Sequence, residues 1–367
     1  MKTYETASYI TISAFAGTLL TNSLLIYLTV FHIKHIIGAY KWMIVIFAST
    51  GVLFSFLEAI VRPCVHNFNG GFIFFSLNEY LPKCLLSIGI ACYSGFFSSL
   101  LAFVTMQFIF RCWTLIGSKL IRHFRGFKAI FWMFFVTFPC AFFGLLISNL
   151  IPPDPFSDAY FQEELLQIYE LGVKDTPRFI MIPYKSDGVR WKDVAFVVIT
   201  GISEVTWQYY YEYLKKFQIT NLIIIAYCAL RMRREMNLRL KVMSKRNRRL
   251  ETQFFKALLA QSAFPTFLLA LPTGPVLLLP FMDLKISLQS GFLFSLFSMY
   301  PPMDSIAMMM IIKEYRTCGK KVLSNIVNVC FFTSSSGAPE SRISSLTASR
   351  DVSFISNRVK QSATGSN

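Results

Sequence analysis

The chain has 367 residues, of which 54% are hydrophobic and only 15% are charged, and its mean hydropathy is +0.49. Soluble domains carry about a quarter charged residues. This composition therefore excludes a water-soluble domain, a disordered tail protein and a small disulfide-stapled secreted module. The net charge of +16 lies between the apolar blocks, which is typical of a membrane orientation signal and excludes a nucleic-acid partner.

Apolar blocks of about 20 residues, the length that crosses a bilayer as a helix, follow one another along the chain. They predict an all-α membrane protein, with a seven-transmembrane helix bundle within residues 1–317 and a cytoplasmic Ser/Thr-rich tail over residues 318–367. The predicted spans are residues 9–31, 42–61, 84–110, 129–151, 195–230, 257–282 and 286–312.

The fifth predicted span is interrupted by a charged block, residues 203–216, between two short apolar pieces. Each of its four charged side chains would cost about 2.5–3.5 kcal/mol at the bilayer centre, so the block does not lie there. Two alternatives remain open. Either the block is an aromatic stretch at the outer interface, or residues 203–220 are an insertion in the conceptual sequence, such as a translated intron.

Lysine and arginine counts predict the orientation, because positive residues are retained on the cytoplasmic side. With the N-terminus outside, the segments on the inner side hold 24 positive residues and those on the outer side hold 9. The N-terminus is therefore expected outside, and an odd number of spans places the C-terminus in the cytoplasm.

Several short motifs support a family resemblance that covers nearly the whole chain. These are residues 22–29, 38–41, 62–66 and 253–261, Pro265 and Pro272, residues 300–304 and residues 312–316. With them the chain resembles the nematode seven-transmembrane chemoreceptors of the Str type, a divergent group of G-protein-coupled receptors. Members of that group usually end the third span with a Tyr-Arg-Tyr-like triplet, where this chain has Phe110-Arg111-Cys112.

The resemblance implies an olfactory-type chemoreceptor that binds a small apolar or volatile ligand and activates a heterotrimeric G protein. It also implies a multi-pass protein of the plasma membrane, located in the cilia of sensory neurons. The competing class is a seven-helix transporter or ligand-gated cation channel, which in the insect odorant receptors has the opposite orientation.

Asp304 is an ionisable residue within an apolar span, which is costly in lipid and requires a partner. Asn22 lies at about the same depth, roughly 20 Å from the outer end at 1.5 Å per residue. We expect a polar network of Asn22, Asp304 and Tyr300 between the first and seventh spans. It is either a conformational switch or a hydrogen-bonded contact that only fixes packing.

Aromatic residues on the third span and two residues at the start of the seventh are the candidate ligand contacts: Tyr93, Phe96, Phe97, Gln289 and Phe292. Small residues at positions 91, 95, 99 and 102 occupy the opposite face of the third span and predict a close helix neighbour. Glu58 lies near the outer end of the second span, where it is expected to act as an interfacial anchor rather than as a ligand group.

The G-protein-facing candidates are Arg111 at the inner end of the third span and Arg231, Arg233 and Arg234 in the basic third inner loop. Arg111 alone is typical of an anchor that reaches lipid phosphates, and its signalling role is implied by the resemblance. Cys318, beside two lysines after the seventh span, is a palmitoylation candidate.

Cys64 and Cys84 bracket the first outer loop, on the oxidising side. A disulfide between them and two free thiols are equal alternatives. The sequence holds no GxGxxG, Walker, HExxH or GxSxG motif and no metal-spaced set of cysteines. We therefore expect no enzyme activity, no cofactor and no metal site.

Overall fold

The computed structural model divides the chain into two units, Met1–Arg316 and Thr317–Asn367. It describes residues 3–33, 39–124, 126–185, 187–206, 227–235, 245–265, 267–268, 271–282, 284–322 and 324. In the second unit, residues 317–322 are helical. The charged block of the fifth predicted span lies mostly outside the described residues, which resume at 227.

The first four predicted spans are confirmed as helices long and apolar enough to cross a membrane. Their bounds are α1 Thr3–Tyr27, α2 Ala39–Val61, α3 Lys83–Ile116 and α4 Lys128–Leu150. A turn of π-helix over Leu28–His32 extends α1. The third helix runs six residues past its predicted end at residue 110, because a helix continues until a cap or turn stops it. For α3 this is Gly117, with φ of +71°.

The later spans consist of shorter helices. The fifth is represented by α6 Trp191–Thr206 and by helical residues 227–235. Within the sixth, the described residues form α8 Lys245–Pro265 and α9 Leu271–Leu278, and the seventh is divided into α10 Gly291–Ser298 and α11 Tyr300–Ile311. Both described helices of the sixth span contain a proline, Pro265 in α8 and Pro275 in α9, which lacks the backbone N–H that a continuous helix uses.

The all-α prediction is wrong at one end of the bundle, where three interhelical loops build a four-stranded sheet in the order β3-β2-β1-β6. The strands are β1 Pro63–Phe68, β2 Gly71–Ser76, β3 Arg178–Met181 and β6 Ser287–Leu288. The last of these occupies the start of the predicted seventh span. A separate hairpin pairs β4 Tyr184–Lys185 with β5 Gly188–Val189.

The antiparallel pairing of β1 with β2 places Phe68 opposite Gly71 across a two-residue turn. The turn residues Asn69 and Gly70 both have positive φ, at +44° and +77°. An Asn-Gly turn of this kind matches the twist of the flanking strands. It fixes the register of the hairpin, and through it the positions of the side chains described below.

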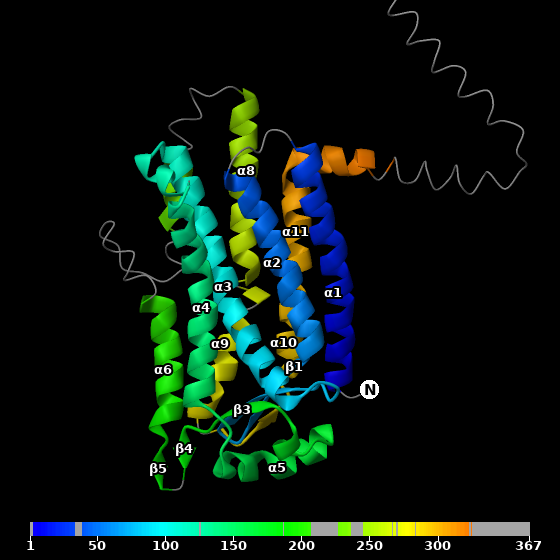
Figure 1. Cartoon of the computed structure of the whole chain (residues 1–367), viewed down its shortest axis with the longest axis vertical. Coiled ribbons are helices and arrows are strands. Elements are labelled where there is room, and N and C mark those ends of the chain that lie inside the picture. The colour runs from blue at the N-terminus through cyan, green and yellow to red at the C-terminus, as the bar shows by residue number, and fades with distance from the viewer. Residues whose placement is uncertain are drawn as a thin grey trace, which may run out of the picture. The chain divides into compact units, whose positions relative to one another are not determined.

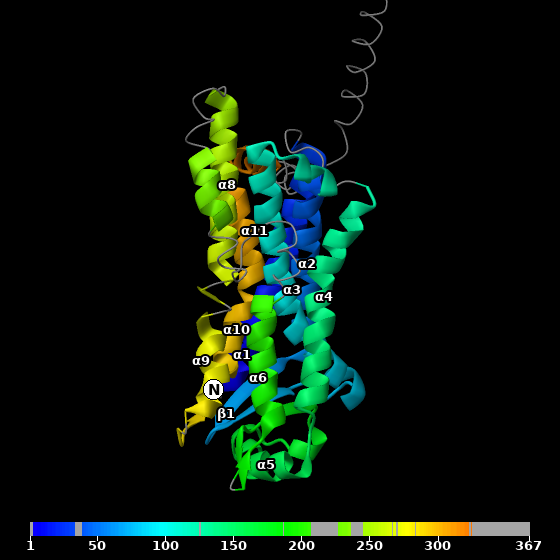
Figure 2. The same ribbon diagram turned by 90° about the vertical axis from the view of Figure 1, so that its left-hand side faces the viewer.

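The sheet lies between one end of the helix bundle and α5 Pro155–Tyr169, and the start of α1 lies at this same end (Figures 1 and 2). We call it the sheet end. Side chains from one face of the strands and from α5 form a buried apolar cluster that includes Ile73, Phe75, Phe161 and Leu165. The other face turns toward the helices, where the Phe74 ring lies 6.4 Å from that of Tyr93. Both faces of β2 are buried.

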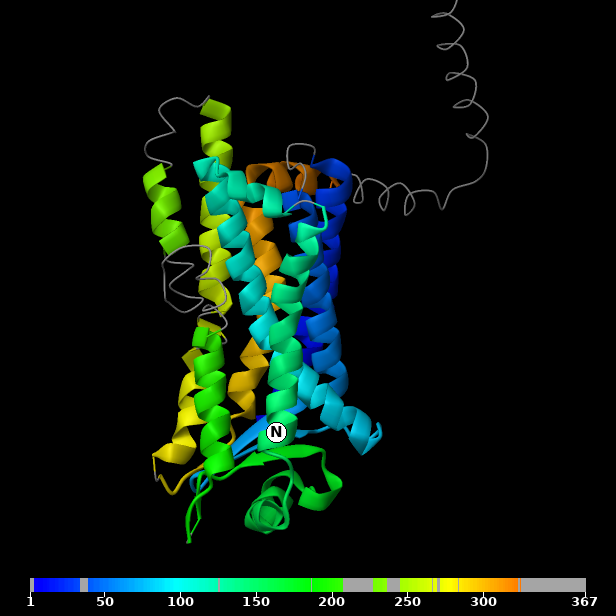
Figure 3. The ribbon, with the colours of Figure 1, turned by 60° about the vertical axis from the view of Figure 1, so that its left-hand side comes forward.

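Small residues allow α3 and α4 to run side by side at close range, as Figure 3 shows. A Cβ atom built on Gly95 would lie 2.3 Å from the carbonyl oxygen of Cys140, and one built on Gly144 would lie 3.5 Å from that of Ala91. The small face that the sequence predicted on the third span therefore packs against the fourth helix.

We predict that Gly95→Ala destabilises the bundle, because the added methyl group meets backbone that cannot move without separating α3 from α4. Such overpacking costs about 1–3 kcal/mol, to be measured as a lower Tm of the purified protein. Gly274→Ala in α9 is the matched control, since a Cβ there meets nothing within 4 Å. Equal Tm values for the two variants would contradict the close approach.

Candidate functional site

A cavity of about 410 Å³ lies at the sheet end, within the size range of small-molecule sites. Its walls come from α1, the end of α2, the start of β1, the end of α5 and the start of α10, elements that can be located in Figure 1. The polar side chains on its wall include Ser8, Thr11, Glu58, Arg62, Gln289 and Ser295.

Glu58 is 3% exposed and faces this cavity from α2. The Tyr93 hydroxyl of α3 donates a hydrogen bond to Glu58 Oε1 at 2.9 Å. The expected role as an interfacial anchor is therefore wrong, because the carboxyl group points into the bundle and not toward headgroup water. The depth of Glu58 along α2 indicated a place at the membrane interface. The rotation of α2 about its own axis, however, turns this side chain into the bundle.

Arg62 follows α2 with φ of +48°, an uncommon conformation for a non-glycine residue. Its guanidinium donates to the Ser8 hydroxyl of α1 at 3.1 Å, while Nε is buried and has no hydrogen-bond partner among the described residues. The carbonyl of Arg62 accepts a hydrogen bond from Leu77 N at 3.0 Å, which joins the two ends of the β1–β2 hairpin.

The five predicted ligand residues occupy different surroundings. Gln289 and Phe292 line the cavity, and Tyr93 bonds to the Glu58 carboxyl group that lines it. Phe96 lies 6.5 Å from the Phe54 ring, and Phe97 is stacked on Phe297 at 6.1 Å. Neither of these two lines this cavity. Ligand contact stays a prediction for all five residues.

His66 of β1 is a fully buried junction between the loops of the sheet. Its Nε2 lies 3.1 Å from Glu164 Oε1 of α5, and its Nδ1 lies 3.3 Å from the Tyr169 hydroxyl. The Ser287 hydroxyl of β6 donates to the same Glu164 oxygen at 2.5 Å. Burial lowers the pKa of His66 below its usual value, although the hydrogen bond and charge of Glu164 act in the opposite direction.

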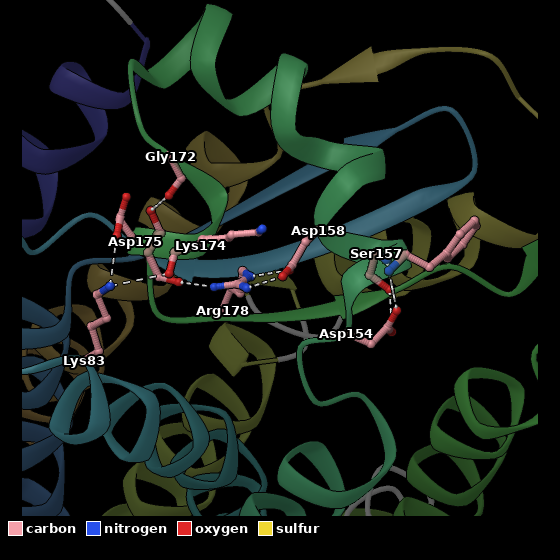
Figure 4. A network of polar contacts seen from close by, with 10 residues as sticks. Lys83, Asp154, Ser157, Asp158, Gly172, Lys174, Asp175 and Arg178 are labelled. Atoms are coloured by element: carbon pink, nitrogen blue, oxygen red, sulfur yellow. Dashed lines mark hydrogen bonds and ion pairs between the residues drawn. The ribbon is translucent and has the colours of Figure 1, made fainter.

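Further ion pairs join α5 and the loop that follows it to the sheet and to α3 (Figure 4). Arg178 of β3 donates two hydrogen bonds to the Asp158 carboxylate of α5, at 2.7 and 2.6 Å. This bidentate arrangement is among the strong protein hydrogen-bond geometries. Asp154 caps the first turn of α5 by accepting from two backbone N–H groups, and Lys83 of α3 pairs with Asp175 at 3.0 Å.

The structure does not form the disulfide that the sequence left open, because Cys64 and Cys84 are both free thiols. Cys64 is buried in the apolar cluster of the sheet, whereas Cys84 is exposed at the start of α3. Burial raises the pKa of Cys64 to about 12, which keeps this thiol protonated and poorly reactive.

Asn22 joins three helices in the bundle core. Its Nδ2 donates to the Ala48 carbonyl of α2 at 2.9 Å, and the Ser305 hydroxyl of α11 donates to its Oδ1. A polar connection between the first and seventh predicted spans therefore exists, but it runs through Ser305 and not through Asp304.

Asp304 turns instead toward α8, where Gln261 Nε2 donates to its Oδ2 at 3.1 Å. The second carboxyl oxygen has no hydrogen-bond partner among the described residues, and the same is true of the buried Tyr300 hydroxyl one turn earlier. The sequence missed Gln261 as a partner because depth does not show which helix a side chain faces.

At the opposite end of the bundle, Arg111 of α3 packs between two aromatic rings. Its guanidinium carbon lies 3.4 Å from the Tyr40 ring centroid of α2 and 4.1 Å from the Phe254 ring centroid of α8. One terminal nitrogen lies 4.0 Å from Glu251. We call these four residues the Arg111 cluster. Its cation–π contacts close the space between three helices at this end.

The other basic candidates lie on helical residues 227–235, where Arg231, Arg233 and Arg234 are exposed. Arg231 donates to the Tyr227 hydroxyl one turn earlier, at 2.9 Å. Cys318 is half-buried in the second unit, and its palmitoylation stays a prediction. Among the described residues, no cluster of His, Cys, Asp and Glu could hold a metal ion.

The family model described as "Serpentine type 7TM GPCR chemoreceptor Str" matches residues 7–320. The chain belongs to this receptor family. It is 40% identical over 311 residues to "G-protein coupled receptor str-33" of Caenorhabditis elegans, covering 83% of this chain and 86% of that protein. It is 24% identical over 294 residues to "Serpentine receptor class r-10" of the same species, covering 78% and 83%.

These relatives are receptors and not enzymes, and several motifs that carried the Str resemblance meet in space in this Str-family receptor. The Thr29 hydroxyl of the first motif lies 2.7 Å from that of Tyr315 in the last. Tyr40 and Phe254, from two others, enclose Arg111. Sequence reasoning identified the motifs but not their contacts, because they are far apart along the chain.

We predict that the stability of this receptor falls as the pH drops below about 6.5, the ordinary histidine pKa, because the lowered pKa of His66 keeps the folded form unprotonated. The unfolded chain then binds a proton that the folded protein does not. His66→Gln removes this contribution, so the Tm advantage of the wild type over the variant should shrink between pH 7.5 and pH 5.

Ser287→Ala is the control, since it removes a hydroxyl of the same network but no titrating group. It should lower the Tm and leave the pH dependence in place. A Tm advantage over His66→Gln that is constant with pH would contradict the buried, neutral histidine.

Proposed function

We propose that this Str-family member is a chemosensory G-protein-coupled receptor that binds a small ligand at the sheet end and activates a heterotrimeric G protein at the opposite end. Family membership is the observation that carries this proposal. The cavity at one end and the Arg111 cluster at the other are consistent with it, because each lies where helices from different parts of the chain meet.

Seven spans with an outer N-terminus follow from the same proposal. The four long apolar helices and the divided later helices supply enough segments, and the lysine and arginine distribution favours this orientation. The sheet end then faces outward, and the serine-rich tail lies in the cytoplasm. The proposed location is the plasma membrane, in the cilia of sensory neurons.

The mechanism is a shift in population between two arrangements of the helices. A ligand changes that equilibrium only as far as it prefers one arrangement. Asp304 and Gln261 join α11 to α8, and the Arg111 cluster joins α8 to α2 and α3. Movement of α8 therefore has to change both contacts, which connects the middle of the bundle to the proposed G-protein surface.

Tags on the two termini in intact cells test the topology. An N-terminal tag accessible from outside and a protected C-terminal tag are expected. An intracellular N-terminus would overturn the receptor topology and favour the seven-helix channel class.

Neutralising the basic surface tests the coupling. We predict that Arg231→Gln, Arg233→Gln and Arg234→Gln together raise the ligand concentration for a half-maximal G-protein reporter response about fivefold or more. Agonists are first found with a chemical panel against cells that express the receptor and the reporter. Ligand binding at the cell surface should stay unchanged, because none of the three arginines lines the cavity.

The matched control removes three positive charges at the sheet end, with Lys83→Gln, Lys185→Gln and Lys192→Gln. The first two lysines make exposed ion pairs, which contribute little to stability. This control should signal normally. Equal responses from the two triple variants would remove the basic surface from the coupling mechanism.

Asp304 separates a switch from a packing role. We predict that Asp304→Ala abolishes or biases signalling while delivery to the cell surface stays measurable, because the substitution removes the polar contact between α11 and α8. Gln261→Ala removes the same contact from the other side and should act in the same direction. Parallel losses of surface delivery and response would show that the contact only fixes packing.

A further inference from the structure

Two unsatisfied polar atoms belong to residues that line the cavity at the sheet end. Glu58 Oε2 and Arg62 Nε are both buried, and neither has a hydrogen-bond partner among the described residues. The Ser298 hydroxyl lies near the Glu58 carboxyl group but does not complete a hydrogen bond to Oε2. A buried polar atom without a partner costs about 1–3 kcal/mol, so two such atoms in one cavity call for an explanation.

The two side chains do not satisfy each other, although Arg62 follows Glu58 by only four residues. The Arg62 N–H donates to the Glu58 carbonyl at 2.8 Å, which places both residues at the same end of α2. Their side chains diverge: the Glu58 carboxyl group is held by Tyr93, and the Arg62 guanidinium is held by Ser8. The cavity is thus lined by two residues that each carry one buried polar atom without a partner among the described residues, an acceptor on Glu58 and a donor on Arg62.

The rest of the cavity is partly apolar. Ala59 and Leu77 lie on its wall, and Ile12 of α1 and Phe292 of α10 lie on its rim, 57% and 46% exposed. The cavity wall therefore combines polar and apolar side chains, with apolar residues contributed by both α1 and α10.

We propose that this cavity binds a small amphiphilic hydroxy acid or amino acid. Its hydroxyl or ammonium group donates to Glu58 Oε2, its carboxylate accepts from Arg62 Nε, and its alkyl chain packs against Ala59, Ile12 and Phe292. This assignment rests on the proposed receptor function and specifies the ligand class for it.

A purely apolar odorant would fill the same volume and leave both buried polar atoms unpaired. A site built to hydrogen-bond a polar group discriminates strongly against the analogue that lacks it, because the polar groups of the protein then stay unsatisfied. A ligand with only one of the two groups forms a hydrogen bond with one of these atoms and leaves the other atom unpaired. The ligand class is therefore set by the two atoms together and not by the apolar area of the cavity.

A matched series of six-carbon compounds tests the proposal on the purified wild-type receptor in lipid nanodiscs. The probes are 2-hydroxyhexanoate, 2-aminohexanoate, hexanoate, 1-hexanol and 2-hexanone, and the measurement is direct binding by calorimetry together with the shift in Tm. The hydroxy or amino acid should bind at least about tenfold more tightly than hexanoate or hexanol, which corresponds to about 1.4 kcal/mol. 2-Hexanone should bind most weakly.

Two variants assign each contact to its residue. Glu58→Gln should reduce the advantage of 2-aminohexanoate over hexanoate, because the amide cannot pair with the ammonium charge. Arg62→Met should remove the advantage of 2-hydroxyhexanoate over 1-hexanol. Asp175→Asn and Lys83→Met change the exposed pair Lys83–Asp175 outside the cavity and should leave the order of affinities unchanged.

Equal binding of all five compounds, tighter binding of 2-hexanone, or no binding of either acid would overturn the proposal. The wild-type series decides this even where a variant fails to fold. Binding of the acids without any G-protein response would leave the ligand class standing and contradict the proposed function. A G-protein response to other agonists with no binding of the acids would contradict the ligand class and leave the proposed function standing.

Discussion

Hydrocarbon offers no hydrogen bonds, so a polar side chain between membrane helices has to find its partner within the protein. In this receptor three buried amide or carboxyl groups find such a partner on a different helix. Asn22 pairs with Ser305, Glu58 with Tyr93 and Asp304 with Gln261. These contacts fix the positions of α1, α2, α3, α8 and α11 more specifically than apolar packing does, since lipid tails compete with apolar side chains but not with hydrogen bonds.

This need for a hydrogen-bond partner is not met at every buried polar atom of the described residues. Glu58 Oε2 and Asp304 Oδ1 are buried acceptors without partners among the described residues. The first belongs to a residue that lines the cavity at the sheet end, and the second lies where α11 meets α8. At the opposite end, the aromatic partners of Arg111 come from other helices and not from residues adjacent in sequence. Tyr40 and Phe254 thus surround the arginine although the triplet around it lacks tyrosine.

The sequence predicted those structural features that depend on the composition of a single segment. Apolar length was enough for the first four spans, and small-residue spacing was enough for the close packing of α3 on α4. It did not predict properties that depend on rotation or on distant pairing. Glu58 was misassigned because depth does not specify which way α2 is turned, and the pairing of Asp304 with Gln261 was missed for the same reason. The sheet was missed because β2 is buried on both faces and shows no alternation, although the Asn69-Gly70 turn was a hairpin signal.

The order in which the sheet can assemble follows from its topology. The β1–β2 hairpin is local and can form as soon as it emerges, and β3 adds about a hundred residues later. The last strand comes from much farther along the chain, since His66 and Ser287 are 221 residues apart. Until residue 287 has been synthesised, the edge of β1 that pairs with β6 has unpaired backbone N–H and C=O groups, a feature prone to wrong association. Completion of the sheet is therefore a late event in biogenesis, and a truncated or wrongly inserted chain would keep an open strand edge that folding chaperones can recognise.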